Sequence, residues 1–466
     1  MTKGKEKPKS FQSPRGTHDI LPGEQIIWEK VRDSLRAISS FYGFERIETP
    51  HFEDTDLFTV GIGRNTDIVS KEMYSFKTRS GDALTLRPEG TASVARAYAE
   101  HGMMNLPQPV KLYYIGAFFR HDKPQRGRYR EFHQWGLEIM GDGSAVSDAE
   151  VIRVFTLLLE EWSFKDYLVE VNSIGCLVCR GPYRAQLTAY YRSRLRGLCR
   201  DCRERFRENP LRLLDCKEER CTMIRKNAPQ LLDKLCEACR NHFRLLLEFL
   251  EEMKIPYALN PHLVRGLDYY TKTVFEAFIE EPVKATAAAS EPVRAGDAAG
   301  AVDGAVAPVA AEDGHDSAPS AKRLAVFGGG RYDNLIELVG GKPTPACGGA
   351  LGLERFVGII RDRGKVPATP RPKTFFVQLG DLAKKKGFHL MEELRRAGIS
   401  MAESLGRDSI RSQLKVADHV GALYALILGQ KEALDGTVIL REMSSGMQET
   451  IAQDKLVETL RKKLKH

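Results

Sequence analysis

Residues 118–134 read FFRHDKPQRGRYREFHQ and give the clearest local signal in the chain. Aromatic and apolar residues flank a Lys-Pro-Gln-Arg-Gly turn, which predicts a β-hairpin. Because strand side chains alternate, Arg128, Gln134 and Glu138 are expected on one face of the second strand, with Arg120 ending the first. Guanidinium groups suit phosphate oxygens. The hairpin therefore predicts a site for a polyanion and a polar small molecule, and an exposed hairpin with ordinary surface charges is the alternative.

The composition is that of an ordinary globular protein large enough for several domains. The 466 residues are 42% hydrophobic and 28% charged, and the formal net charge is +8. This charge permits an acidic partner such as nucleic acid without requiring one. The first ten residues are basic and lack an apolar core, and no apolar run is long enough for a membrane span. We expect a cytoplasmic protein with no membrane association.

Phosphate would have to be held without a glycine-rich loop. The sequence contains neither G-x-x-x-x-G-K-[ST] nor G-x-G-x-x-G before a helix. Any bound phosphate would therefore have to be held by arginines and a metal ion. Leu86–Thr91 is expected between a strand and a helix, with Thr91 as N-cap. The segment Leu263–Tyr270 has the character of a buried strand, although it carries Arg265. A helix is expected over Ala350–Arg361.

Together these motifs resemble the class II aminoacyl-tRNA synthetases, and within that class the histidyl-tRNA synthetase family. The segment Ile47–Pro50 resembles the first class motif, whose proline lies at a dimer interface. Phe119–Gln134 resembles the second motif, and Gly352–Arg355 resembles the third. Two stretches, Arg265–Tyr270 and Gly329–Asp333, resemble patterns particular to the histidine enzymes.

The resemblance implies an α+β fold with an antiparallel-sheet catalytic core, a helical insertion and a C-terminal α/β anticodon-binding domain. Residues 284–322 contain no aromatic residue, leucine or isoleucine, so that stretch is expected to be disordered. The implied parts are a flexible lead (1–15), the first part of the core (16–165), a Cys- and Arg-rich insertion (166–253), the second part of the core (254–363), a linker (364–373) and the anticodon-binding domain (374–466).

The implied activity is that of a homodimeric histidine–tRNA ligase. Such an enzyme joins L-histidine to ATP, with Mg²⁺, to give histidyl-adenylate and pyrophosphate, and then transfers histidine to the 3′ end of tRNA(His). The substrate carboxylate attacks the α-phosphate directly, so the protein supplies alignment and fixed positive charge rather than a nucleophile.

The resemblance also implies roles for individual residues. Arg120 would hold the α-phosphate, Arg355 the γ-phosphate, and Arg265 the α-phosphate and the histidine carboxylate from the opposite side. The implied ATP site comprises Arg120, Arg128 and Arg355, and the tRNA acceptor end would meet Gln125 and Arg126. The implied histidine site comprises Glu89, Thr91 and Gln134 for the ammonium group, Glu138 and Tyr270 for the imidazole nitrogens, Arg265 for the carboxylate, and Tyr269 and Tyr332 along its walls.

Eight of the nine cysteines form four close pairs in the expected insertion. Such pairs suit tetrahedral zinc at two pairs per ion, which predicts one or two structural zinc ions; buried free thiols are the alternative. The many arginines of this segment favour either a clamp on the tRNA acceptor arm or a solvated helix face. The pairs are Cys176 with Cys179, Cys199 with Cys202, Cys216 with Cys221 and Cys236 with Cys239.

Two other functions remain open at this point. A non-catalytic synthetase-like regulator could bind histidine or a partner enzyme, and a class II synthetase could use another amino acid. The regulator is disfavoured because Arg120, Arg265, Arg355 and a C-terminal domain are all present. Histidine-dependent exchange of pyrophosphate into ATP distinguishes all three.

Overall fold

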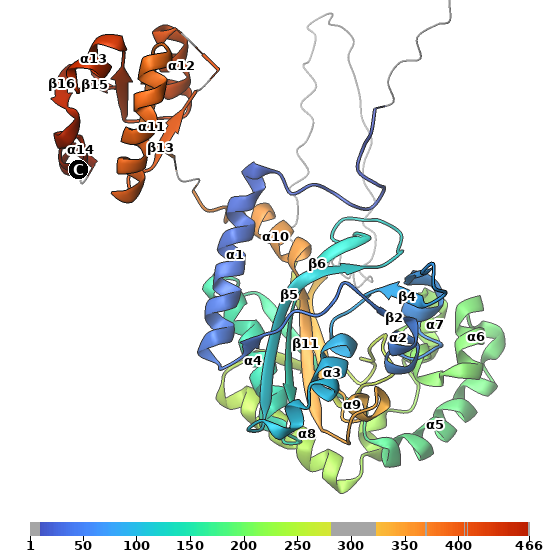
Figure 1. Ribbon diagram of the computed structural model, residues 1–466. Coiled ribbons are helices and arrows are strands. Elements are labelled where there is room, and N and C mark those ends of the chain that lie inside the picture. The colour runs from blue at the N-terminus through green and yellow to red at the C-terminus, as the bar shows by residue number, and fades with distance from the viewer. Residues whose placement is uncertain (1–9, 281–322, 369–370, 405, 408, 465–466) are drawn as a thin grey trace, which may run out of the picture. The chain divides into compact units, whose positions relative to one another are not determined.

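The computed structural model describes residues 10–280, 323–368, 371–404, 406–407 and 409–464 (Figure 1). The chain divides into two compact units, Met1–Pro367 and Ala368–His466, and the division falls inside the expected linker. The expected disordered insertion (284–322) and residues 1–9 of the expected lead lie outside the described residues.

An eight-stranded sheet is the centre of the first unit. Its inner strands are antiparallel, and only the terminal pairs, β1 with β5 and β7 with β8, are parallel. A three-stranded sheet, β2 (Phe52–Asp54), β4 (Ala83–Leu86) and β3 (Tyr74–Lys77), lies beside it. In spatial order the large sheet contains β1 (Glu45–Arg46), β5 (Val110–Phe119), β6 (Glu131–Met140), β11 (Ala346–Gly352), β10 (Arg323–Arg331), β9 (Thr271–Glu280), β7 (Tyr167–Ser173) and β8 (Tyr257–Leu259).

The predicted hairpin is confirmed as β5 and β6, which pair without a register shift from Val110↔Met140 to Phe119↔Glu131. The second strand begins at Glu131, so Arg128 belongs to the turn, where it bridges to Gln125. The alternation expected for Gln134 and Glu138 holds, but it does not extend back to Arg128.

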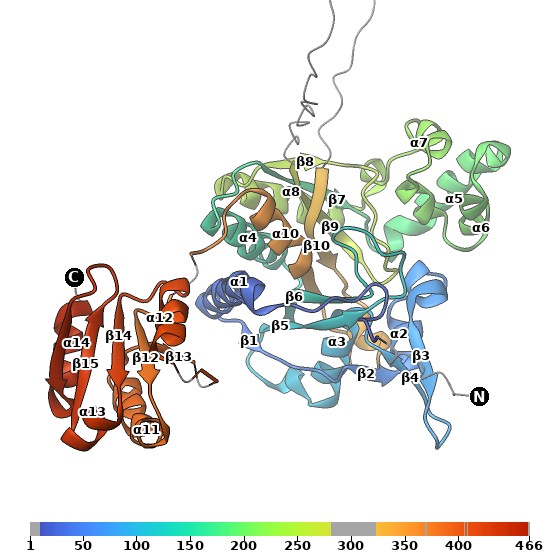
Figure 2. The ribbon, with the colours of Figure 1, turned by 90° about the horizontal axis from the view of Figure 1, so that it is seen from above.

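The two faces of the large sheet differ in what covers them. On β6, Trp135 and Leu137 are buried under a layer of helices, whereas Gln134 and Glu138 face the other way. Figures 1 and 2 show this helical layer against one face of the sheet. The helices are α1 (Pro22–Phe41), α4 (Ala145–Glu161), α8 (Glu237–Glu252) and α10 (Leu353–Asp362). The opposite face is partly covered by α3 (Thr91–Glu100) and α9 (Leu335–Leu338), and it carries the polar side chains that could form a site.

Short helices and turns form the insertion beside that opposite face (Figure 1). They include α5 (Leu177–Arg192), α6 (Arg200–Glu208) and α7 (Glu219–Arg225). The strand β7 pairs with β9 in the large sheet, and α8 packs in the core under it. The helical insertion proper is therefore narrower than 166–253, because both ends of that range belong to the sheet and its helical layer.

Two expected elements differ from the structure. The segment Leu263–Tyr270 is a loop rather than a strand. Side chains of the insertion hold it, since Asn209 Nδ2 donates to Asp268 Oδ1 at 2.9 Å. The helix expected from Ala350 begins only at Leu353, because β11 stays paired with β6 as far as Gly352.

The second unit is a five-stranded sheet with helices on both faces, as expected for a small α/β domain. Helix α12 (Ile410–His419) covers one face, and α11 (Asp381–Arg396), α13 (Gln430–Asp435) and α14 (Leu456–Leu464) cover the other. In spatial order its strands are β13 (Met401–Glu403), β12 (Thr374–Gln378), β14 (Tyr424–Leu428), β15 (Thr437–Glu442) and β16 (Gln448–Ala452). Across the described parts of both units, none of the helices has the length and apolar character needed to cross a membrane.

Candidate active site

Three arginines from distant parts of the sequence line one cavity of about 1440 Å³. Arg120 follows β5, Arg265 comes from the loop between β8 and β9, and Arg355 lies in the first turn of α10. Gln125 and Arg128 of the hairpin turn line the same cavity. The structure thus brings together the residues that the sequence assigned to ATP.

The Arg120 guanidinium is fixed by the backbone that precedes α3 (Thr91–Glu100). Its Nε donates to the Pro88 carbonyl at 2.8 Å, and its guanidinium carbon lies 5.4 Å from the centre of the Phe132 ring. Burial lowers the pKa of Arg120, and Glu72 partly offsets that effect. A guanidinium remains charged after such a change, so Arg120 presents a fixed, poorly solvated cation to the cavity.

Arg265 is held by a residue that the sequence analysis did not identify. Its Nη1 lies 2.9 Å from Glu276 Oε1, while its Nε is buried without a hydrogen-bond partner. Burial acts to lower the pKa of Arg265, but Glu276 raises it above its ordinary value. The signal was present, since Glu276 interrupts the otherwise apolar run Val274–Ile279 of β9.

Gly328 of β10 makes room for this arginine. A Cβ atom at position 328 would lie 2.7 Å from Arg265 Nη1, closer than side-chain atoms approach one another. Glycine is therefore needed for the guanidinium to lie flat against the strand.

Arg355 faces the cavity from the third side. Its Nη1 donates to the Ala325 carbonyl at 2.5 Å, and burial together with the charge of Arg128 lowers its pKa. Arg128 itself is paired with Asp122 at 3.1 Å. The two arginines repel each other across the cavity mouth, so an anion bound between them would relieve that repulsion.

The turn residues predicted to meet tRNA lie at the rim. Gln125 and Arg126 both line the cavity, and Arg126 forms an ion pair with Asp362 at the end of α10. An incoming phosphate would compete with this carboxylate for the guanidinium.

A cluster of buried polar side chains, which we call the polar pocket, surrounds Glu138 on the site face of β6. Thr91 Oγ1 donates to Glu138 Oε1 at 2.7 Å, and the Tyr332 hydroxyl donates to Oε2. Tyr114 lies at hydrogen-bond limit, 3.5 Å from Oε1. Glu138 is fully buried, and burial raises its pKa to about 8, an effect that the bonds from Tyr332 and Thr91 only partly offset.

Glu89 occupies the N-terminus of helix α3. Its carboxylate accepts from the backbone N–H of Thr91 at 2.8 Å and of Ala92 at 2.9 Å. The prediction that Thr91 caps the helix was wrong, because Gly90 is the N-cap and the Thr91 hydroxyl is used by Glu138. Burial raises the pKa of Glu89.

Three glycines leave the space that this polar pocket requires. A Cβ atom at Gly348 would lie 1.8 Å from Glu138 Oε2, and one at Gly136 would lie 2.0 Å from the Tyr114 ring. A Cβ atom at Gly90 would lie 2.3 Å from the same ring. Small residues on adjacent strands thus allow one carboxylate and one phenol to be buried side by side.

Tyrosine rings and an unpartnered amide complete the pocket. The Tyr269 ring lies 4.7 Å from that of Tyr270 and 5.7 Å from that of Tyr332, centre to centre. Gln134 Oε1 is buried and has no hydrogen-bond partner among the described residues. Such an acceptor is costly unless a ligand donates to it.

The raised pKa of Glu138 predicts a pH-dependent stability difference. The folded protein holds this proton more tightly than the unfolded chain does, so the contribution of Glu138 is fully present below the ordinary carboxyl range and is lost as pH rises towards about 8. Relative to the parent, Glu138→Gln should therefore gain stability between roughly pH 5 and 8, by up to about 5 kcal/mol. Urea unfolding of both proteins across this range measures the difference, and a constant difference would contradict the assignment.

Beneath the site, an ion cluster fixes the end of β10. Arg331, which is fully buried, lies 2.8 Å from Asp148 of α4, and Asp148 also contacts His242 of α8 at 2.6 Å. Arg331 lies within the motif Gly329–Asp333, but no role was predicted for it. Its pairing with Asp148 holds the neighbouring Tyr332 at the point where its hydroxyl meets Glu138.

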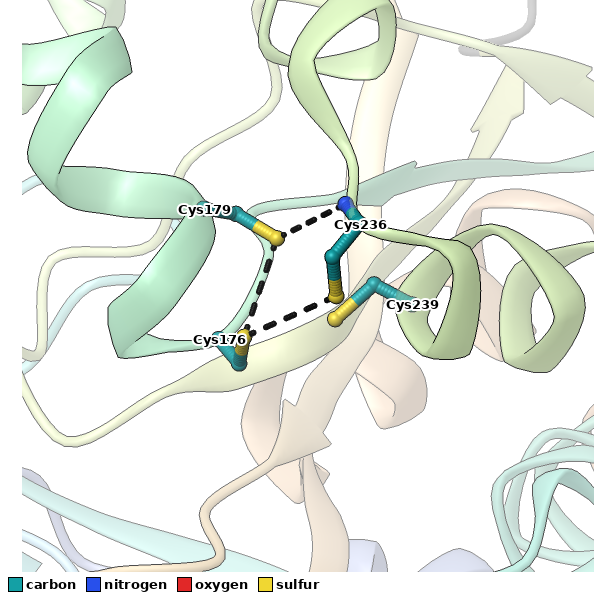
Figure 3. A group of neighbouring side chains, drawn as sticks. All are labelled: Cys176, Cys179, Cys236 and Cys239. Carbon is teal, nitrogen blue, oxygen red and sulfur yellow. Dashed lines mark hydrogen bonds between the residues drawn. The ribbon is translucent and has the colours of Figure 1, made fainter.

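The eight paired cysteines of the insertion gather into two groups of four. The first pair joins the fourth, as Figure 3 shows, and the second joins the third. Within each group all four sulfur atoms lie within 4.8 Å of one another. The groups are Cys176, Cys179, Cys236 and Cys239, and Cys199, Cys202, Cys216 and Cys221.

Comparison with known proteins covers both units. The family described as histidyl-tRNA synthetase matches residues 16–289, and that described as anticodon binding domain matches residues 376–463. The histidine–tRNA ligase of Dehalococcoides mccartyi is 42% identical over 455 residues, which is 97% of this chain and 100% of the relative. The histidine–tRNA ligase of Caldicellulosiruptor saccharolyticus is 41% identical over 456 residues, which is 97% of this chain and 100% of that relative.

A solved structure agrees with these relatives. The crystal structure of apo S. aureus histidyl-tRNA synthetase has a TM-score of 0.74 and 31% sequence identity, covering 97% of this chain and 99% of that one. The expected fold, an antiparallel-sheet core with a C-terminal anticodon-binding domain, is confirmed. The chain belongs to the histidyl-tRNA synthetase family of class II aminoacyl-tRNA synthetases.

Proposed function

We propose that this protein is a histidine–tRNA ligase that forms histidyl-adenylate from L-histidine and ATP and then esterifies the 3′ end of tRNA(His). The observation that carries the proposal is the convergence of Arg120, Arg265 and Arg355 on one cavity beside the buried carboxylate of Glu138. Family membership and relatives at about 41% identity over nearly the whole chain support the same activity.

The arginines account for the first reaction. Attack of the histidine carboxylate on the α-phosphorus of ATP builds negative charge on phosphoryl oxygens, and pyrophosphate leaves. Arg120 and Arg265 would stabilise that charge from two sides, while Arg355 and Arg128 bind the outgoing phosphates. Fixed cations in a poorly solvated site are worth roughly 10²–10³ in rate each. Mg²⁺ would enter with ATP and bridge its phosphates.

The polar pocket accounts for amino-acid selection. A neutral imidazole has one donor and one acceptor nitrogen, which Glu138 and Tyr270 would satisfy. Gln134, Glu89 and Thr91 would bind the ammonium group, and the unpartnered Gln134 oxygen supports this role. Tyr269 and Tyr332 would form the walls.

The second reaction needs the tRNA acceptor end at the same cavity. Gln125 and Arg126 in the hairpin turn would contact the acceptor end. Arg126 would then leave its ion pair with Asp362 and bind a tRNA phosphate instead. The second unit would bind the anticodon, as its match to the anticodon-binding family indicates. A cytoplasmic location follows from the same proposal, because the substrate tRNA is used by ribosomes there.

A homodimer belongs to the proposal as well. Next to the segment that resembles the first class motif, the apolar side chains of Phe41, Phe52 and Phe76 are exposed, at 84%, 51% and 44%. The rings of Phe52 and Phe76 lie 6.4 Å apart, centre to centre, and exposed apolar side chains that adjoin one another favour an interaction surface. Light scattering after gel filtration should give twice the chain mass of 52.3 kDa, and Phe52→Glu should shift the protein towards the single-chain mass. A mass of 52.3 kDa at micromolar concentration would contradict the dimer.

Structural zinc in the insertion is also part of this proposal. The four cysteine pairs have the spacing that tetrahedral zinc requires, and their sulfur atoms gather in two groups of four, each within 4.8 Å.

Charging of unfractionated tRNA tests the activity. With ATP and Mg²⁺ the protein should attach radiolabelled histidine to tRNA, and mild alkali should release it because the product is an ester. A folded protein that charges tRNA with another amino acid, or with none, would contradict the proposal.

A further inference from the structure

We propose that the insertion binds two separate zinc ions, one in each group of four cysteines, and that these ions brace the loop and backbone that present Arg265 and Tyr270 to the substrates. The bracing role rests on the proposed histidine–tRNA ligase function, whereas the metal sites do not.

Sulfur spacing is the first argument. A zinc ion with bonds of about 2.3 Å to four thiolates places the sulfur atoms about 3.8 Å apart. Cys176 Sγ lies 3.6 Å from Cys179 Sγ and 3.9 Å from Cys236 Sγ, and in the other group Cys199 Sγ lies 3.8 Å from Cys216 Sγ. Disulfide sulfurs are only about 2 Å apart, so these contacts are not disulfides. The distances match the edges of a tetrahedron around zinc.

Helix ends and backbone amides around the sulfurs are the second argument. Cys176, Cys199 and Cys236 are the N-cap residues of α5, α6 and α8. The positive end of a helix favours thiolate over thiol. The backbone N–H of Cys236 also donates to Cys179 Sγ at 3.1 Å, and that of Cys199 donates to Cys221 Sγ at 3.3 Å. Such second-layer donors are typical of zinc–thiolate centres.

The first site would clamp the two ends of the insertion. It joins the start of α5 to the start of α8 (Figure 3), although 60 residues separate Cys176 from Cys236. Arg180, one residue after Cys179, donates to the Ile174 carbonyl at 3.0 Å and to the Tyr270 carbonyl. A fixed first turn of α5 therefore holds the backbone of Tyr270, a residue of the polar pocket.

The second site would brace the loop of Arg265. Between its cysteines lie Asn209, which donates to Asp268 at 2.9 Å, and Arg212, which contacts Asp67 at 2.7 Å and the Gly266 carbonyl at 3.4 Å. Cys216 itself lines the cavity of the three arginines. This segment has no long helix or sheet of its own, so cross-links between its short elements must fix those side chains.

Metal content measures the two sites separately. Full-length protein expressed with zinc should contain two equivalents by inductively coupled plasma mass spectrometry. The double variant C236S/C239S should keep only the ion of the second site, and C216S/C221S only that of the first. The matched control is C347S, which removes the buried ninth cysteine outside both groups and should keep both ions. Zinc-supplemented protein with less than about 0.2 equivalent would overturn the proposal, and so would C347S losing an ion.

If a double variant does not fold, the bound ions and the reactive thiols can be counted on the unsubstituted protein by native mass spectrometry and thiol titration. Two ions should be released together with eight newly reactive thiols when a chelator is added to reduced protein. Release of one ion with four thiols would overturn the second centre.

Hydrogen exchange tests the bracing role. In C216S/C221S, amides of residues 263–270 should exchange at least about tenfold faster, while those of β7 keep their rate. Unchanged exchange in the loop would overturn the bracing role and leave the metal sites standing. Because none of these measurements uses substrates, a failure of this proposal is distinct from a failure of the protein to activate histidine.

Discussion

Arg265→Ala is expected to lower histidine-dependent exchange of pyrophosphate into ATP by about 10²–10³-fold while leaving the fold intact. The guanidinium is the cation opposite Arg120, and Glu276 and the missing side chain at Gly328 fix its position. Its loss removes stabilisation that exists only as charge builds on the α-phosphate, so kcat should fall more than the KM for ATP rises.

Arg153→Ala provides the matched control for this variant. Arg153 is also paired with a glutamate, Glu160 at 2.7 Å, but it lies on α4 and does not line the cavity. Circular dichroism should show both variants folded, and Arg153→Ala should exchange pyrophosphate at the parental rate. If Arg265→Ala did the same, Arg265 would have no part in the reaction.

Glu138→Gln is expected to lower kcat/KM for histidine by about 10²–10³-fold. Burial raises the pKa of Glu138 to about 8, and a bound imidazole N–H would favour the ionised form; a charged hydrogen bond of this kind is worth roughly 1.5–3 kcal/mol. An amide also disturbs the bonds from Thr91 and Tyr332, which adds to the loss. The KM for ATP should change little, since Glu138 does not line the arginine cavity.

Glu150→Gln is the control for the loss of a half-buried, paired carboxylate. Glu150 lies on α4, outside both pockets, and its carboxylate is 2.5 Å from the Lys111 ammonium group. The kinetic constants for histidine should therefore be unchanged in this variant. If Glu138→Gln and the parent protein had equal kcat/KM for histidine, Glu138 would have no part in selecting the amino acid.

Local pattern was enough to predict the hairpin and the second unit. Alternation along β6 correctly separated Gln134 and Glu138 from Trp135, because one face of that strand is buried under helices. Strand and helix also alternate after Thr374 as predicted, since both patterns depend only on neighbours in the sequence.

Long-range contacts explain what the sequence did not reveal. Leu263–Tyr270 is apolar enough for a strand, but Asn209 and Arg212 of the insertion bind its backbone and side chains and hold it as a loop. Threonine is a common N-cap residue, yet the hydroxyl of Thr91 donates its hydrogen bond to Glu138 instead of capping the helix. The joining of the first cysteine pair to the fourth likewise depends on how α5 and α8 meet.

The roles assigned to the site residues follow the resemblance, and the geometry makes them chemically consistent. Arg120, Arg265 and Arg355 share a cavity, whereas the contacts around Glu138 form a separate polar pocket. Glu276 supports Arg265, and Asp148 supports the strand end that carries Tyr332.

Exchange of labelled pyrophosphate into ATP by the purified full-length protein, with Mg²⁺ and one amino acid at a time, tests the central claim most directly. The expected result is exchange with L-histidine and background with every other amino acid. Exchange supported by a different amino acid would contradict the assigned specificity, and a folded protein that gives background with all of them would contradict the enzyme itself.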